Sequence, residues 1–219
     1  MGYALDFAAL LQYAGLFVEG AAVTIGLTVV SAALGIALSI AGAAATRGAW
    51  AWARAAVAIY VELFRNTPFI VQLFFVFFGL PSLGVHLTAL AAAVLAMTLN
   101  LTAYAIEIVR AGIDGVPRGQ WDGSASLGLR YLAQLRLVIL PQALRMAVPP
   151  TVGFLVQLLK STALTSVVGY HELTKTGQIL TNATFEPFTI YGLVALIYFA
   201  LCYPLTSCAR SLERRLATG

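Results

Sequence analysis

Polar side chains inside otherwise apolar stretches are the groups in this sequence best suited to chemistry. Five of them lie in three long apolar runs, namely Gln72, Asn100, Gln157, Lys160 and Ser161. In such a setting a cation can bind a carboxylate, while amide and hydroxyl groups can bind an ammonium group. The five residues therefore predict a pathway for a zwitterionic solute. The alternative interpretation is that they form hydrogen bonds between neighbouring helices.

Two acid–base pairs also fall inside apolar runs. Glu62 and Arg65 are three residues apart, and so are Glu107 and Arg110. This spacing places each pair on one face of a helix, where the two charges can neutralise one another. We expect Glu62 to pair with Arg65. For Glu107 and Arg110 we expect either pairing or a role at an inner gate.

The elements that must position these groups are membrane spans. Of the 219 residues, 60% are hydrophobic and 10% are charged, whereas a soluble domain averages roughly 45–50% apolar and about 25% charged residues. A span needs about 20 mostly apolar residues. Five stretches qualify or come close: 16–45, 55–80, 87–109, 147–170 and 188–209. We therefore predict one all-α membrane domain with five transmembrane helices, and a new helical segment starting at Pro68.

The basic residues predict the orientation of these spans. Ten of the 13 lie in segments on one side: Arg47, Arg54, Arg110, Arg118, Arg130, Arg136, Arg145, Arg210, Arg214 and Arg215. The opposite side carries only Lys175. Short loops rich in Lys and Arg stay in the cytoplasm, so we expect the N-terminus outside and the C-terminus inside. The charge is spread over three segments without a nucleic-acid-binding module, and no nucleic acid partner is expected.

The longest segment between spans, residues 110–146, is cytoplasmic by this count. Its sequence predicts a short helix over 120–126, a sharp bend at Gly128 and a second helix over 129–140, with Pro141 and Pro149-Pro150 breaking the chain afterwards. Two short helices between two spans predict a compact protruding knob. Loops of this length are usually functional.

This loop carries a recognisable motif. From Asp122 the chain reads Asp-Gly-Ser-Ala-Ser-Leu-Gly, then nine residues, then Val138-Ile-Leu-Pro141. The pattern resembles the signature of ABC importer permeases: Glu-Ala-Ala, three residues, Gly, nine residues, Ile, any residue, Leu-Pro. Here Asp122 replaces Glu, and Gly123 and Ser124 replace the two alanines. The flanking segments resemble the polar amino acid permeases of the histidine, glutamine, arginine and glutamate type; they are 60–68, 72–75, 103–113, 119–120, 140–143, 160–164 and 172–173. Ser161 stands where the family often has Asp or Asn.

The resemblance implies that the loop docks on a pair of cytoplasmic ABC ATPase subunits. The residues that match the docking motif are Gln120, Asp122, Gly123, Ser124, Gly128, Leu140 and Pro141. Small residues allow close backbone approach. A carboxylate near a helix start is favoured by the helix dipole, so Asp122 either serves as a helix cap or pairs with a basic group of the partner.

ATP and Mg²⁺ are expected on the partner, because the chain has no glycine-rich phosphate loop: Lys160-Ser161 lacks the preceding glycine. We expect no catalytic residue, no cofactor and, with Cys202 and Cys208 six residues apart on a helix, no metal site. The resemblance further implies a second permease chain (a copy or a relative), a periplasmic or tethered binding protein, a polar amino acid substrate and a place in the bacterial inner membrane.

Three other functions stay open at this point. An ion-coupled secondary carrier would need more mid-membrane carboxylates than Glu62 and Glu107. A structural membrane anchor would not need the polar groups around Lys160. A permease of the same family could also import an opine-like amino acid derivative.

Overall fold

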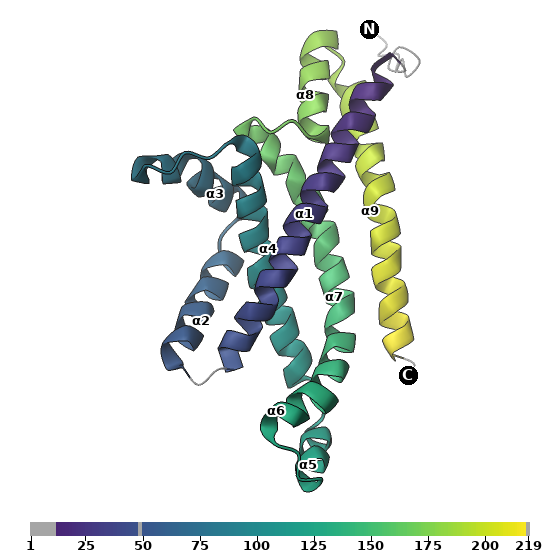
Figure 1. The fold of residues 1–219 in the computed structure, drawn as a ribbon. Coiled ribbons are helices and arrows are strands. Elements are labelled where there is room, and N and C mark those ends of the chain that lie inside the picture. The colour runs from purple at the N-terminus through teal and green to yellow at the C-terminus, as the bar shows by residue number, and fades with distance from the viewer. Residues whose placement is uncertain (1–11, 48–49, 218–219) are drawn as a thin grey trace.

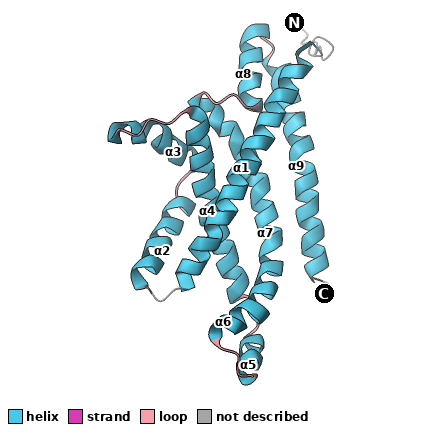
Figure 2. Cartoon of the chain, viewed as in Figure 1, coloured by secondary structure: helices cyan, strands magenta, loops and turns pink. Residues whose placement is uncertain are grey.

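Four long helices form the body of the molecule. The computed structural model describes residues 12–47 and 50–217, in which helices are joined by loops (Figures 1 and 2). The long helices are α1 (Ala14–Arg47), α4 (Ala89–Asp114), α7 (Leu140–Ser161) and α9 (Pro187–Ala217). Within the described residues, four helices are long and apolar enough to cross a membrane, and a bent helix pair makes a fifth crossing if it counts as one span. The predicted all-α membrane fold is confirmed.

The helices pack in chain order, α1 on α4, α4 on α7 and α7 on α9. Leu27, Met97, Leu101 and Leu158 form a buried cluster where three of them meet. Many other large apolar side chains point outward, including Val18, Val29 and Ile40 on α1. Such exposure would be unfavourable in water, so lipid or another membrane chain must cover these faces.

The second predicted span, 55–80, is not one straight helix. It consists of α2 (Ala51–Arg65) and α3 (Phe69–Phe74), continued by a π-helical turn Phe75–Gly79 and a 3₁₀ turn Leu80–Leu83. The two halves are bent by 110°, and α3 leads sideways out of the bundle (Figure 1). Pro68 precedes the second half; it cannot donate a backbone hydrogen bond and disfavours a helical conformation at the residue before it.

The loop between α4 and α7 forms a projection at one end of the bundle (Figure 1). It contains α5 (Arg118–Ser126) and α6 (Tyr131–Gln134), and we call residues 115–139 the knob. Gly128 connects the two helices with a φ of 74°, a left-handed conformation that favours glycine. The bend predicted at Gly128 is therefore present.

The predicted second short helix, 129–140, is wrong as a separate element. After α6 the chain makes a π-helical turn over Leu135–Ile139 and continues directly into α7, so that Pro141 does not break it. Pro149 and Pro150 also lie inside α7. Just before Pro141, the π turn has i→i+5 hydrogen bonds in place of the i→i+4 bonds of an α-helix. Membrane helices tolerate proline where neighbouring helices and hydroxyl side chains compensate for the lost hydrogen bonds. The knob is consequently continuous with a membrane helix.

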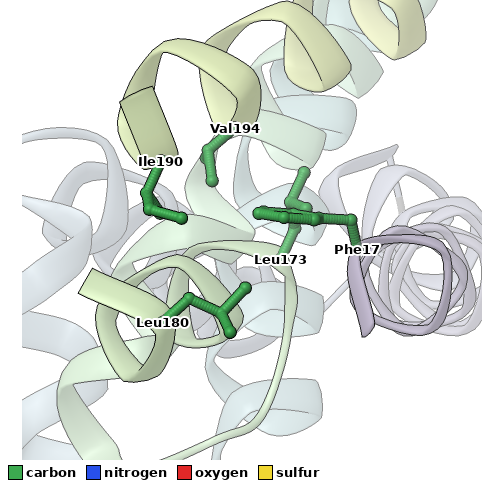
Figure 3. Close-up of a cluster of buried hydrophobic side chains, with 5 residues drawn as sticks. All are labelled: Phe17, Leu173, Leu180, Ile190 and Val194. Atoms are coloured by element: carbon green, nitrogen blue, oxygen red, sulfur yellow. The ribbon is translucent and has the colours of Figure 1, made fainter. Parts of the chain in front are cut away.

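The opposite end of the molecule contains a helix that the sequence analysis did not predict. The fourth span was expected over 147–170, but α7 gives way to a 3₁₀ segment at Thr162–Val168, and α8 (Leu173–Thr184) follows. Phe17, Leu173, Leu180, Ile190 and Val194 form a buried cluster that joins α8 to α1 and α9 (Figure 3). The predicted placement of the N-terminus falls on residues 1–11, which lie outside the described residues.

Candidate functional site

The knob is a packed unit fastened to the bases of α4 and α7. Ile113, Val116, Ile139 and Ala143 are buried together, and Trp121 of α5 packs against them. The Gln142 amide donates to Gln120 Oε1 at 3.2 Å, a direct contact between α7 and α5. Because α5 is held on both helices, a force on the knob is transmitted to α4 and α7.

The motif residues divide into an inner and an outer set. Ser124 is buried and its hydroxyl donates to the Trp121 carbonyl at 2.9 Å. Asp122, Gly123 and Gly128 are exposed on the knob surface, whereas Leu140 is half-buried in α7. Ser124 thus faces inward and bonds within α5, while Asp122, Gly123 and Gly128 remain free to meet another molecule.

The structure corrects the helix-cap interpretation of Asp122. Helix α5 begins at Arg118, Pro117 precedes it, and no acidic residue lies in its first turn. Asp122 is therefore in the second turn, beyond the main effect of the helix dipole. No hydrogen bond or ion pair of its carboxylate is found in the described part of the chain, and the group is available to a partner.

The knob also exposes large apolar side chains. Leu127 is 81% exposed and Leu132 is 73% exposed. Leu127 directly follows α5, and Leu132 lies in α6. The knob thus exposes both a carboxylate and large apolar groups, a composition typical of protein-docking surfaces.

Between α2 and α4, the predicted contact of Glu107 with Arg110 is present, but that of Glu62 with Arg65 is not. The Arg110 guanidinium donates to both carboxylate oxygens of Glu107, and Arg65 Nη1 lies 3.7 Å from Glu107 Oε1. The expected pairing of Glu62 with Arg65 is wrong, because Arg65 turns to Glu107 and also lies over the Tyr104 ring, 5.7 Å from its centroid. Glu62 accepts instead from the Asn66 amide at 2.8 Å. Glu107 therefore joins two helices.

Gln72 and Asn100 support the bend between α2 and α3. The Asn100 amide donates to Gln72 Oε1 at 2.9 Å, and Gln72 Nε2 donates to the carbonyls of Phe64 and Thr67 at 2.8 and 3.0 Å. Those carbonyls lose helical partners at the break. Both side-chain amides are buried and already hydrogen-bonded within the protein. This matches interhelical hydrogen bonding better than contact with a solute.

Lys160 lines a different region, a groove of about 460 Å³ between α7 and α9. The other lining residues are Ala195, Tyr198, Phe199, Cys202, Tyr203 and Thr206. Gln157 is exposed on the same helix, and its carbonyl accepts from the Ser161 hydroxyl at 3.0 Å. The predicted pathway residues thus separate into two groups: Gln72 with Asn100, and Gln157 with Lys160 and Ser161. In the described part of the chain, the Lys160 ammonium has no hydrogen-bond or ion-pair partner.

Comparisons with known proteins identify this arrangement. The family model described as the inner membrane component of binding-protein-dependent transport systems matches residues 35–218. The chain belongs to this family. It is 35% identical to the arginine transport system permease protein ArtQ of Bacillus subtilis over 98% of this chain and 99% of that protein. It is 33% identical to the glutamine transport system permease protein GlnP of Escherichia coli K12, with 96% and 97% coverage.

Solved structures agree. A crystal structure of an amino acid ABC transporter with histidines superposes on this permease with a TM-score of 0.92 at 32% identity, covering 97% of this chain and 99% of that one. The MetNI methionine transporter, at 23% identity and a TM-score of 0.75, shows the same fold. The recognition made on the motif residues is confirmed. The protein is a multi-pass inner membrane permease subunit that is not itself catalytic and carries no cofactor, and its family implies ATPase and binding-protein partners.

Sequence reasoning missed one candidate residue in the permease. Glu172 is fully buried and begins α8, where its side chain accepts from the Lys175 backbone amide at 2.8 Å. Leu173, Gly177 and Leu180 are buried on one face of that helix. Their i, i+4, i+7 spacing after an acidic cap is the signal that could have predicted α8.

Proposed function

We propose that this permease forms one half of the membrane path of an ATP-driven importer for polar amino acids. The observation that carries the proposal is the knob, an exposed docking surface continuous with α7. Two relatives are permeases for arginine and for glutamine, which supports the substrate class. A pair of separate ATPase subunits would dock on the knob and supply the energy.

The charges of the structure support an inward-facing knob. Arg118, Arg130 and Arg136 belong to the knob or its flanks, and Arg210 and Arg214 lie near the end of α9 at the same end of the molecule (Figure 1). Segments rich in Lys and Arg stay in the cytoplasm. We infer that the knob faces the cytoplasm, that α8 faces outward, and that the C-terminal end of α9 is inside.

Docking at the knob would use the exposed motif residues. Asp122 offers a carboxylate to a basic group of the ATPase, and Gly123 and Gly128 add no side chain that would hold the partner away from the backbone. Leu140 and Pro141 start α7, so movement of the docked ATPase would tilt α7 directly. Rocking of helices about such a contact alternates access between the two sides of a membrane.

The α7–α9 groove is the part of the predicted pathway that the geometry supports. Lys160 is a cation without a partner in the described residues, and an unpaired charge within a span faces a cavity or a partner group. We infer that its ammonium receives the substrate carboxylate while hydroxyl groups such as Thr206 receive the ammonium. A second permease chain, a copy or a relative, would close the open side of the groove, and a binding protein would deliver substrate from outside.

The function is tested by reconstituting the permease with its ATPase and binding protein in lipid vesicles. We expect ATP hydrolysis to rise when the binding protein carries a polar amino acid, and labelled amino acid to enter the vesicles. Lys160→Gln should reduce uptake by roughly tenfold or more, the loss expected for one charge-assisted contact. Lys175→Gln, at the chain's other lysine, is the matched control and should leave uptake near wild type. Uptake at the wild-type rate by Lys160→Gln would refute the assignment of Lys160 to the pathway. If no amino-acid-loaded binding protein stimulates ATP hydrolysis by the wild-type complex, the proposed function is wrong.

A further inference from the structure

Glu172 is a buried carboxylate without a basic partner, which is a costly arrangement inside a protein. Its relative exposure is 0%, and no ion pair involves it among the described residues. Instead, each oxygen accepts a hydrogen bond: Oε1 from the Lys175 amide at 2.8 Å and Oε2 from the Tyr198 hydroxyl at 2.7 Å. The Thr24 hydroxyl lies 3.5 Å from Oε2. The carboxylate is therefore held by three different helices.

Tyr198 extends this network to a fourth element. Its hydroxyl lies 3.1 Å from Thr174 Oγ1 and 3.2 Å from Thr162 Oγ1. Since the Tyr198 proton goes to the carboxylate, the Thr174 hydroxyl is the donor in its contact, whereas the Thr162 hydroxyl donates to the Leu159 carbonyl at 2.7 Å and lies beside the Tyr198 hydroxyl. Thr162 opens the 3₁₀ segment directly after Ser161. The network therefore joins α1, α8 and α9 to the chain segment that follows Lys160.

The Glu172 side chain itself is shielded from solvent beside a tightly packed contact of α1 with α8. The buried cluster of Figure 3 lies beside them and contains Phe17 and Leu173. At Gly20, an added Cβ would lie 2.7 Å from Thr176 Oγ1 and 3.0 Å from Leu173 Cα, so α1 and α8 approach closely. Hydrogen bonds are stronger where water is excluded, and α8 has little room to shift.

The network also reaches the groove. Tyr198 lines the α7–α9 groove together with Lys160, while its hydroxyl is bound to Glu172. We propose that Glu172 is a positioning residue for transport: by holding the Tyr198 hydroxyl, it fixes the Tyr198 ring in the wall of the groove beside Lys160. This inference rests on the groove being the amino acid path.

A purely apolar contact would attach α8 equally well, as the neighbouring cluster shows. The carboxylate adds directionality, because it accepts hydrogen bonds only over a limited range of angles and therefore orients the Tyr198 hydroxyl. Loss of the contact should therefore change how the permease responds to substrate before it changes whether the permease folds. That difference separates positioning from simple stability.

The test uses the reconstituted complex and compares two variants, Glu172→Gln and Tyr198→Phe, with two controls. Glu186→Gln removes a different carboxylate near the end of α8, and Tyr191→Phe removes a hydroxyl from α9 for which the structure gives no hydrogen bond. The readout is the ratio of substrate-stimulated to basal ATP hydrolysis. We expect Glu172→Gln to keep basal hydrolysis, and both variants to lower the ratio by roughly tenfold, the effect of one hydrogen bond to a charged group. The double variant should be no worse than the more impaired single one, and the controls should keep the wild-type ratio.

A second measurement does not depend on transport. Amide hydrogen exchange of the permease in lipid nanodiscs should show α8, including the Lys175 amide, exchanging about tenfold faster in Tyr198→Phe than in Tyr191→Phe. Wild-type ratios in both variants, additive effects in the double variant, or unchanged exchange in α8 would overturn the inference. A wild-type complex that ignores amino acids while α8 still loosens in Tyr198→Phe would count against the proposed function alone, and would leave the hydrogen-bonded support of α8 standing.

Discussion

The contact between α4 and α7 just above the knob leaves no room for a side chain at Gly112. A Cβ built there lies 2.7 Å from the Ala143 carbonyl oxygen and 3.4 Å from Ala147 Cβ. The oxygen belongs to the backbone of α7 and cannot rotate away. An ordinary contact distance requires the two helices to separate by about 0.7 Å, and overpacking of this kind costs about 1–3 kcal/mol.

Gly112→Ala should therefore destabilise the permease relative to Gly26→Ala. Gly26 also lies within a span, but an added Cβ meets nothing within 4 Å. Both changes improve helix propensity by about 1 kcal/mol, so the difference between them isolates the overpacking term. Thermal unfolding of the two purified variants in lipid nanodiscs should show Gly112→Ala melting at the lower temperature, by about 2–4 °C per kcal/mol for a chain of this size.

The same separation should weaken coupling, because α4 and α7 are the two helices that hold the knob. In the reconstituted complex, Gly112→Ala should lower substrate-stimulated ATP hydrolysis more than Gly26→Ala does. Equal melting temperatures for the two variants would refute the reasoning, since they would mean that α4 and α7 do not touch closely at Gly112.

Three further outcomes follow from the geometry. Gly128→Ala should destabilise the knob by about 1–2 kcal/mol, because an added Cβ has space there but the left-handed φ of 74° is unfavourable for alanine. Gly123→Ala, at a position without a positive φ, is the control and should not destabilise it; thermal unfolding of the two permease variants compares them. Glu107→Gln removes the charge that Arg65 and Arg110 share, and because these side chains are partly exposed it should cost about 0.5–1 kcal/mol, measured as unfolding free energy in bicelles; a stability equal to wild type would show that the cluster does not join α2 to α4. Gln72→Leu removes the donor to two carbonyls at the bend and the acceptor for Asn100, and should cost about 1–3 kcal/mol; spin-label distances between α2 and α3 should broaden, and an unchanged distribution would contradict the supporting role.

The spans could be predicted because they depend on composition alone. A run of about 20 apolar residues has few alternatives to a membrane helix, and so 16–45 and 188–209 correspond to α1 and α9. The knob could be predicted because Gly128 and the motif spacing are local features. Both predictions use information contained within one segment of the chain.

The errors occurred where distant segments decide the outcome. Pro141, Pro149 and Pro150 are helix breakers by local rules, but α7 stays continuous because a π turn and its neighbours compensate for the lost hydrogen bonds. Arg65 has Glu62 three residues away, yet Glu107 on another helix lies within 3.7 Å. Sequence spacing cannot rank a local partner against one that folding brings near.

Glu172 illustrates the same limit more strongly. Its partners Thr24 and Tyr198 are 148 and 26 residues away, so nothing in the local pattern marks it as buried. The predicted pathway residues lie in two places for a similar reason. Gln72 donates to carbonyls at the bend before α3, and Asn100 donates to Gln72, whereas Lys160 lines the groove beside α9.

Coupling through the knob is the central claim, and binding of the ATPase to a charge-reversed knob tests it most directly. The permease is co-expressed with its ATPase as wild type, as Asp122→Arg and as Glu213→Arg, which reverses another exposed acid near the end of α9. The amount of ATPase recovered per permease is then measured after purification. We expect Asp122→Arg to lose the ATPase while Glu213→Arg retains it. Full recovery of the ATPase with Asp122→Arg would contradict the account.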